Sequence, residues 1–338
     1  MRSIRLGIAG FGRIVELTHL PLLKKMPEFD ICGVYDLTPQ RRALAQRRGF
    51  AAWEHLSELL DSDADAVLIA TPPHSHCAIA AEALRRGKHA LIEKPVAVCA
   101  EEAFLLQQLA QENNRIVTVF HNRRFDSDLK IVEETIQSGM LGPIQFVERR
   151  FHQFGSGSSF GVQSFRPSWR DEISYGGGAL LDWGVHLIDQ LLHLKLGKLS
   201  NVHAMMHRLP WSKGDAEDYV AASLPLDNGI LLSLHIHFAS HAADPQWIVG
   251  GERGTLQIKS GGEAVMQLEG RPPIPLGGQS PGKAYRGDLE GVGNIYASFA
   301  EKLAGEGELA VTLEEAIEGM IVIDEIRAAA CSRELRTP

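Results

Sequence analysis

The sequence predicts an α/β protein in two parts: a doubly wound parallel sheet, then an α+β domain with a large, mostly antiparallel, open-faced sheet. Up to residue 122, short β-branched runs alternate with helical patterns, as in parallel strands joined by crossover helices. Beyond it, longer strands follow one another without helices between them, which is typical of antiparallel sheets. We therefore divide the chain into residues 1–122 and 123–338.

In the first part, five apolar runs have the length and composition of buried strands. They span residues 4–9, 29–35, 66–70, 89–92 and 116–120. Helical patterns separate them at residues 14–26, 39–48, 74–86 and 101–113. The strand cores are almost entirely apolar, as expected for strands that are covered by helices on both faces.

The second part mixes helices with longer strands. Helices are predicted at residues 126–138, 179–196, 288–304 and 312–332, and strands at residues 144–152, 201–208, 218–224, 229–239, 246–250 and 254–258. A polar loop at 153–175 precedes three glycines and the apolar helix, and residues 261–283 are predicted to be a long loop because they are rich in Gly and Pro. Thr312 and Glu315 form a capping-box pattern.

The composition argues against several classes of protein. A formal net charge of −8 is unlike a nucleic-acid-binding protein, which shows a basic face. No apolar run reaches the ~18 residues of a membrane span, and the first residues lead directly into a strand pattern rather than a signal peptide. The scattered cysteines contain no CxxC pair, so we expect neither disulfides nor structural zinc, and a reducing cytoplasm as the location.

A glycine-rich turn joins the first strand to the first helix. Gly10 permits a tight turn, Gly12 lets the backbone approach a pyrophosphate, and the helix amides would point at that anion. Val15 stands where the strict dinucleotide fingerprint has a small residue, which predicts slightly looser helix packing. An ordinary turn is the alternative, but the strand-then-helix context favours a Rossmann domain. The residues expected at the cofactor here are Gly10, Phe11, Gly12, Arg13 and Ile14.

Asp36 stands at the end of the second strand. A carboxylate there can accept both ribose hydroxyl protons of NAD and would repel the 2′-phosphate of NADP. It could instead cap the next helix, but Thr38 and Pro39 already supply an N-cap and a favoured first residue, so we expect Asp36 to be free for the ribose. Arg41 and Arg42 lie nearby and could help to bind NADP, so NAD is favoured without excluding NADP.

The turn Glu93-Lys94-Pro95 follows the strand at 89–92. Ligands bind at the carboxyl ends of parallel strands, so Lys94 could hold a substrate hydroxyl and stabilise oxyanion character. A lone surface lysine is the alternative. The turn at 71–76 faces the same edge, although His76 there could simply begin a helix. From these segments the expected cofactor set gains Thr71, Pro72, Pro73, His76, Glu93, Lys94 and Asn122.

Asp182 and His186 lie four residues apart in the apolar helix, so they share one helix face. A buried imidazole is suited to take an alcohol proton as a general base, with Asp182 orienting it or binding the same hydroxyl. A core histidine with a local hydrogen bond is an equal alternative. A metal site is disfavoured, because no third ligand stands at a recognisable spacing.

Taken together, these residues resemble the Gfo/Idh/MocA family of oxidoreductases over nearly the whole chain. The matching motifs are the glycine loop, Asp36, Thr71-Pro72, Glu93-Lys94-Pro95, Asn122-Arg123-Arg124-Phe125, residues 139–142, Gly177-Gly178, the Asp182/His186 helix and residues 250–256. The resemblance implies hydride transfer, without a metal, between C4 of a nicotinamide and a carbon of a sugar, cyclitol or related polyhydroxy substrate. It also implies that Lys94, Asp182 and His186 form the catalytic set.

The loop at 153–175 is expected to line the substrate pocket. Trp169 could stack on a sugar face and Arg170 could bind hydroxyl or carboxylate groups, with core packing an equal alternative for Trp169. Together with Lys94, Asp182 and His186, they form the predicted substrate-binding set.

The strand near residues 231–238 alternates in character. Leu232, Leu234, Ile236 and Phe238 are predicted to pack under helices, and Ser233, His235 and His237 to lie on the opposite face. In related proteins this open face forms a subunit interface, so we expect a homodimer or homotetramer and no nucleic-acid or membrane partner. A histidine metal site there is a weaker alternative.

The leading functional hypothesis is an NAD(P)-dependent dehydrogenase or reductase of a carbohydrate-like substrate. One alternative is an NAD-dependent glycosidase or lyase that reduces and reoxidises its cofactor within each turnover. Another is a non-enzymatic regulator that senses a dinucleotide, which we would expect to lack Lys94 or His186. Both residues are present.

Overall fold

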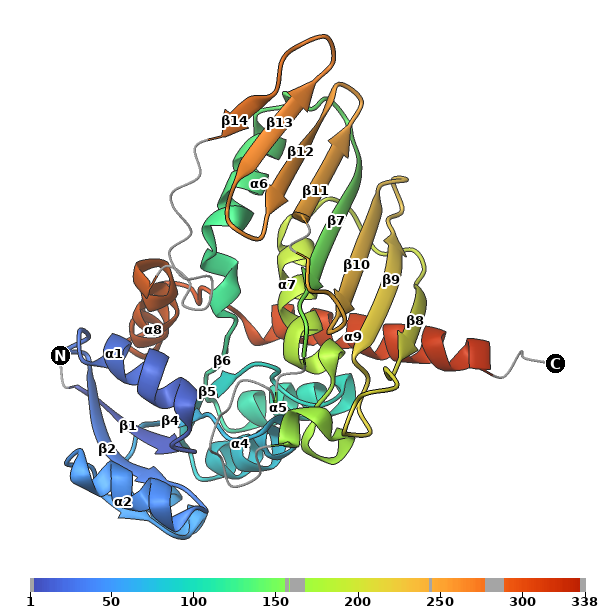
Figure 1. Ribbon diagram of the computed structural model, residues 1–338. Helices are drawn as coiled ribbons and strands as arrows, with labels where there is room; N and C mark the ends of the chain where they lie inside the picture. The colour runs from blue at the N-terminus through green and yellow to red at the C-terminus, as the bar shows by residue number, and fades with distance from the viewer. Residues whose placement is uncertain (1–2, 156–157, 159–167, 243–244, 277–288, 335–338) are drawn as a thin grey trace.

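The computed structural model describes residues 3–155, 158, 168–242, 245–276 and 289–334, and two sheets form its frame (Figure 1). The first sheet is parallel throughout, with the strand order β3-β2-β1-β4-β5-β6 of a doubly wound Rossmann fold. Its strands are β1 (Ile4–Ala9), β2 (Phe29–Tyr35), β3 (Ala52–Trp53), β4 (Ala66–Ile69), β5 (His89–Glu93) and β6 (Val117–Phe120). The five predicted strands are all present; β3 was missed because two residues carry no readable pattern.

Helices connect these strands. They are η1 (Val15–His19), α1 (Leu20–Leu23), α2 (Pro39–Arg47), α3 (Leu56–Leu60), η2 (Pro73–Ser75), α4 (His76–Arg85) and α5 (Ala100–Glu112). The sequence missed the short α3. The helix after the glycine loop begins with the wide turns of a π-helix, η1, in which Val15 is completely buried.

The second sheet has the order β14-β13-β12-β11-β7-β10-β9-β8. Its strands are β7 (Ile144–His152), β8 (His203–His207), β9 (Tyr219–Pro225), β10 (Leu231–His237), β11 (Pro245–Gly251), β12 (Gly254–Lys259), β13 (Ala264–Leu268) and β14 (Ile274–Leu276). The sheet is mostly antiparallel, as predicted, but β7 and β10 at its centre run parallel. The long loop predicted at 261–283 is wrong, since β13 and β14 lie within it: the Gly and Pro residues around these strands hid the buried-exposed alternation of β13.

The remaining helical segments connect or cover this sheet. They are η3 (Asn122–Phe125), α6 (Ser127–Gln137), η5 (Trp169–Asp171), η6 (Ile173–Tyr175), η7 (Leu180–Gly184), α7 (Val185–His193), α8 (Leu289–Leu303) and α9 (Leu313–Glu334). Helices α6 and α7 lie on one sheet face (Figure 1), and Leu232, Leu234 and Ile236 of β10 are buried there as predicted. Ser233, His235 and His237 on the opposite face are only half-buried.

The last two helices tie the two parts together. Helix α9 crosses between them, packing on α5 as well as on α7 and β8 (Figure 1). The predicted capping box at its start is confirmed: Glu315 N donates to Thr312 Oγ1 at 3.2 Å, and Thr312 N to Glu315 Oε2 at 3.0 Å. Helix α8 packs beside β6 of the first part and η3 of the second, and the division after residue 122 stays a prediction. No helix in the described ranges is long and apolar enough to cross a membrane.

Candidate active site

Lys94 and Asp182 come from the two parts of the chain and meet between them. Lys94 directly follows β5, and its Nζ donates to the backbone oxygen of Asp182 at 2.6 Å and to its carboxylate at 3.2 Å. The two side chains are 18% and 16% exposed, so the ion pair is largely shielded from water but still reachable. The structure therefore places these two predicted residues in direct contact.

Asp182 lies in η7, where the helix widens into π-type turns before α7 begins. Such turns often occur at functional sites. Gly178 at φ +108° leads into the segment, and Gly184 ends it, where a Cβ would crowd Leu180. Arg170 Nε lies 3.7 Å from the Asp182 carboxylate, on the oxygen not bonded to Lys94.

The pKa of Asp182 is below its ordinary value. Burial by itself would raise this pKa, but the positive charges of Lys94 and Arg170 outweigh it. Asp182 is therefore an anion held between two cations.

His186 follows in α7 and is 5% exposed. Burial holds its pKa well below the ordinary value, and the charges of Lys94 and Arg123 lower it further. The ring is therefore neutral at neutral pH. Its buried Nδ1 has no hydrogen-bond partner in the described part of the chain, whereas nearly all such atoms in folded proteins are paired. A neutral ring with an unpaired nitrogen is able to accept a proton from a bound molecule.

Two buried arginines hydrogen-bond to side chains of α7, the helix that carries His186. The sequence analysis did not predict these contacts. Arg124 donates to both carboxylate oxygens of Asp189 at 2.6 and 3.1 Å, and to Glu315 at 2.7 Å. Arg149 donates to Gln190 at 2.8 Å. The Asn122-Arg123-Arg124-Phe125 motif was recognised in the sequence, but the partners of Arg124 became known only from the fold.

The glycine loop leaves an open backbone surface at the start of η1. Gly10 has φ +91°, and a Cβ there would lie 2.7 Å from the oxygen of Ala70, so glycine is required. Around Gly12, by contrast, no atom of the described residues lies within 4 Å of a Cβ position. Arg13 and Ile14 are exposed, whereas the side chain of Phe11 is completely buried. The exposed residues of the loop are therefore Arg13 and Ile14, next to a half-buried Gly12.

Asp36 is not free, contrary to the sequence prediction. Its Oδ2 accepts the backbone N–H of Phe11 at 2.7 Å, and its Oδ1 accepts that of Thr38 at 2.7 Å. The Thr38 side chain makes no capping bond, and Asp36 bonds the backbone two residues ahead, as Asp often does in turns. The amide of Phe11 is thereby occupied, while each carboxylate oxygen keeps acceptor capacity for a ribose hydroxyl.

The two arginines considered for NADP are engaged within the protein. Arg41 donates to Glu16 at 2.7 Å. Arg42 donates to the backbone oxygen of Asp36 at 2.9 Å and pairs with Glu54 at 3.1 Å. Binding a 2′-phosphate through either guanidinium would compete with these bonds.

His76 begins α4, which is the alternative that the sequence left open. It is buried, and its ring nitrogens lie 2.7 Å from the backbone oxygens of Pro95 and Thr71. Burial lowers the pKa of His76, so the neutral ring donates to one of these carbonyls at a time. The residue thus ties the turn after β4 to the turn after β5, where the Lys94–Pro95 peptide bond is cis.

The other predicted turn residues occupy the same edge of the parallel sheet. Thr71 and Pro72 follow β4 and are half-buried, Pro73 is buried in η2, and Asn122 begins η3 just after β6. On the substrate side, Trp169 stacks against its neighbour Arg170, whose guanidinium lies 4.3 Å from the ring centre. Arg170 therefore reaches the Lys94–Asp182 pair, while Trp169 supports it.

A buried chain of hydrogen bonds behind Lys94 was not predicted. His19 of η1 lies 2.8 Å from the hydroxyl of Tyr296 in α8 through Nδ1, and 2.8 Å from Glu93 through Nε2. Glu93 in turn accepts the backbone N–H of Lys94 at 3.1 Å. His19 and Tyr296 are completely buried. Residues 19 and 296 stand far apart in sequence, so no local pattern could have paired them.

Comparison with known proteins places this arrangement in a family. A profile described as an oxidoreductase family with an NAD-binding Rossmann fold matches residues 4–121, and that of the GFO/IDH/MocA C-terminal domain matches residues 129–257. The chain belongs to the Gfo/Idh/MocA family. It is thus an NAD(P)-dependent oxidoreductase, and the family resemblance expected from its motifs is confirmed.

Relatives within the Gfo/Idh/MocA family match most of the chain. An uncharacterized oxidoreductase of Schizosaccharomyces pombe is 31% identical over 75% of this chain and 70% of its own length. The scyllo-inositol 2-dehydrogenase (NADP(+)) of Bacillus subtilis is 26% identical over 99% of this chain and 95% of its own. Among solved structures, an NAD-binding protein from Listeria innocua superposes with a TM-score of 0.85 at 28% identity, covering 98% and 96% of the two chains.

Proposed function

We propose that the protein transfers a hydride between C4 of NAD(P) and a hydroxyl-bearing carbon of a sugar, cyclitol or related polyhydroxy compound. The observation that carries this proposal is the meeting of Lys94 with Asp182, one helical turn before a neutral, buried His186 with an unpaired nitrogen. The scyllo-inositol dehydrogenase named above supports a polyhydroxy substrate.

The residues at the edge of the parallel sheet fit a dinucleotide. The space beside Gly12 is open, and the exposed Arg13 and Ile14 lead into η1, an arrangement that suits a pyrophosphate. Asp36 offers acceptors to a ribose, and the two nearby arginines are already paired. These features favour NAD over NADP in our proposal, although the Bacillus relative is named for NADP(+).

Each of the three central side chains has a distinct part in the proposed reaction. NAD(P), when bound, supplies the hydride acceptor or donor. Lys94 donates a hydrogen bond to the substrate oxygen and stabilises negative charge on it. Asp182 holds the ammonium group in place, and neutral His186 takes the hydroxyl proton during oxidation and returns it during reduction.

The test is an absorbance assay for reduced nicotinamide, with purified protein, NAD or NADP, and a panel of sugars and polyols. Net cofactor reduction with at least one of them is expected. Lys94→Ala and His186→Ala should each lower turnover by ~10²–10⁴-fold, the usual contribution of such groups. Dinucleotide affinity, measured by calorimetry, should change little.

Other outcomes would point to other functions. Product formed without net reduction would indicate a glycosidase or lyase with internal recycling of the cofactor. Cofactor binding without turnover of any compound would favour a regulator. Normal turnover in either variant would refute the assignment of that residue.

A further inference from the structure

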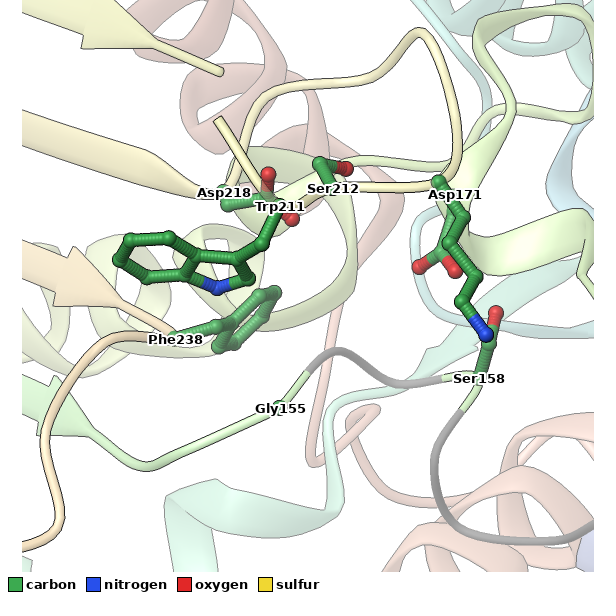
Figure 2. A pocket seen from close by; sticks show the side chains of 8 residues that line it. Gly155, Ser158, Asp171, Trp211, Ser212, Asp218 and Phe238 are labelled. Atoms are coloured by element: carbon green, nitrogen blue, oxygen red, sulfur yellow. The ribbon is translucent and has the colours of Figure 1, made fainter. Parts of the chain in front are cut away.

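A cavity lies at the carboxyl ends of the parallel strands β7 and β10, and Figure 2 shows side chains that line it. Its volume is about 250 Å³. The loop between β8 and β9 contributes Trp211, Ser212, Lys213 and Asp218, Asp171 comes from η5, and Gly155 and Phe238 follow the two strands. Known ligand pockets range from ~300 Å³ upwards, so this space suits one small ring rather than a whole cofactor.

The walls of the cavity combine an aromatic face with carboxylates. Trp211 is 56% exposed, unusual for so large an apolar side chain, and lies beside the buried Phe238 in Figure 2. Asp218 stands next to the indole, and Asp171 lies across from it (Figure 2). An indole offers a flat apolar surface, and carboxylates accept strong hydrogen bonds from hydroxyl groups. A sugar ring has both complements: an apolar C–H face and a rim of hydroxyl donors.

The cavity is built into the fold rather than left by chance between loops. A Cβ at Gly214 would collide with the backbone oxygen of Asp171, so glycine lets the β8–β9 loop pack directly on η5. Ala216 N then donates to that oxygen at 3.1 Å, and Phe238 N donates to the backbone oxygen of Asp218 at 3.1 Å. These bonds tie the loop to η5 on one side and to the end of β10 on the other.

One short turn links this cavity to the reacting centre. Within η5, Arg170 reaches the carboxylate of Asp182 at 3.7 Å, and the next residue, Asp171, lines the cavity. The short segment η5 is therefore a wall shared by the cavity and the Lys94–Asp182 pair. A substrate of two linked rings would contact this segment with each ring.

Charge restricts the kind of ring. Asp171 and Asp218 are 9% and 5% exposed, and Lys213 is the single cation among the described residues that line the cavity. Burial raises the pKa of Asp218, and the charge of Asp171 adds to this effect, so additional negative charge would be unfavourable here. The chemistry suits a neutral sugar better than a phosphorylated or carboxylated one.

We propose that this cavity is a subsite for a second, neutral sugar ring, and that the substrate is a disaccharide or similar glycoside oxidised on the ring next to Lys94. The proposal rests on the function proposed above. It assigns Trp211 as a determinant of substrate length, since the exposed indole is the main apolar surface that the second ring would cover.

The test compares disaccharides with their own monosaccharides. Maltose, cellobiose, lactose, sucrose and melibiose are each assayed with NAD beside their constituent sugars, in the wild type, Trp211→Ala, Trp211→Phe and the control Phe104→Ala. Phe104 is a comparably exposed aromatic, 48%, on α5. We expect at least one disaccharide to exceed its constituents in kcat/KM by about tenfold or more, the scale of one good aromatic contact.

In Trp211→Ala this advantage should shrink to near one, whereas Trp211→Phe should restore most of it and Phe104→Ala should keep it. Turnover of monosaccharides with no gain for any disaccharide, or a gain that survives Trp211→Ala, would overturn the subsite while leaving the proposed function intact. If no sugar is oxidised, the proposed function fails. Calorimetry with NAD-loaded protein then tests the subsite by itself: it is refuted if no disaccharide binds to the wild type more tightly than to Trp211→Ala.

Discussion

Asp182 and His186 share one buried wall, and the same surrounding charges act on them in opposite senses. The positive charge of Lys94 lowers the pKa of both side chains. Arg170 adds to this effect at Asp182, and Arg123 adds to it at His186. A nearby positive charge favours a carboxylate but disfavours an imidazolium. The site therefore holds an ionised acid and a neutral base on the same helix face.

This pairing predicts the pH dependence of oxidation. His186 acts as a base only while it is neutral, and its pKa lies well below the ordinary 6.5. We therefore expect kcat/KM for oxidation to stay level as the pH falls from 8 through 6.5 and to decline only at lower pH, as His186 becomes protonated. An acid limb centred at or above pH 6.5 in the measured profile would contradict the neutral-base assignment.

Asp36 links the glycine loop to the start of α2 through two backbone amides. Removing its carboxylate takes away a ribose acceptor and also the group that would repel a 2′-phosphate. In Asp36→Ala, NAD affinity measured by calorimetry should therefore fall by about tenfold or more, while NADP affinity should fall less. An equal loss for both cofactors would mean that Asp36 only shapes the loop.

At the scale of elements, the Tyr296–His19–Glu93 chain joins α8, η1 and β5 behind Lys94. The pKa of Tyr296 is raised far above its ordinary value, chiefly by burial, so the hydroxyl keeps its proton and can donate to Nδ1 of His19. Nε2 then donates to Glu93, since a carboxylate only accepts. This direction of donation fixes the tautomer of His19 and holds the backbone of Lys94 through Glu93.

Tyr296→Phe tests this chain with a minimal change in shape. It leaves a buried acceptor on His19 unpaired, which typically costs ~1–3 kcal/mol. We expect a loss of this size in the free energy of unfolding by denaturant titration, together with a lower kcat from less precise placement of Lys94. Unchanged stability and kcat in Tyr296→Phe would show that the chain does not position the lysine.

At the scale of the whole molecule, the second sheet buries one face under helices and leaves the other half-covered. Ile248 of β11 lies on that open face, between the buried neighbours Trp247 and Val249, with Glu148 beside it on β7. Our prediction of a homodimer or homotetramer rests on this face.

Sedimentation at micromolar concentration tests the assembly directly. The wild type should behave as an oligomer, and Ile248→Asp should dissociate it, because each interface would bury an unpaired carboxylate near Glu148. Phe104→Asp, outside the sheet, should leave the assembly unchanged. A monomeric wild type would refute the interface.

Local patterns in the sequence predicted most of the elements and singled out Lys94 and Asp182, which the structure brings into contact. Strand-helix alternation predicted the parallel sheet, and the capping box at Thr312 predicted the start of α9 correctly. Two local cues misled: Asp36 bonds the backbone amides of Phe11 and Thr38 rather than staying free, and the glycines and prolines near β13 hid its alternation.

Short motifs and local periodicity were enough to predict the family, the Rossmann sheet and the candidate residues Lys94, Asp182 and His186. Which side chains contact one another became known from the fold. It placed Lys94 on Asp182, tied His19 to Tyr296 across the chain, and set Asp171 in a cavity wall beside Trp211. Such contacts depend on how sheets and helices pack between distant segments, and packing of that kind leaves no periodic trace along the chain.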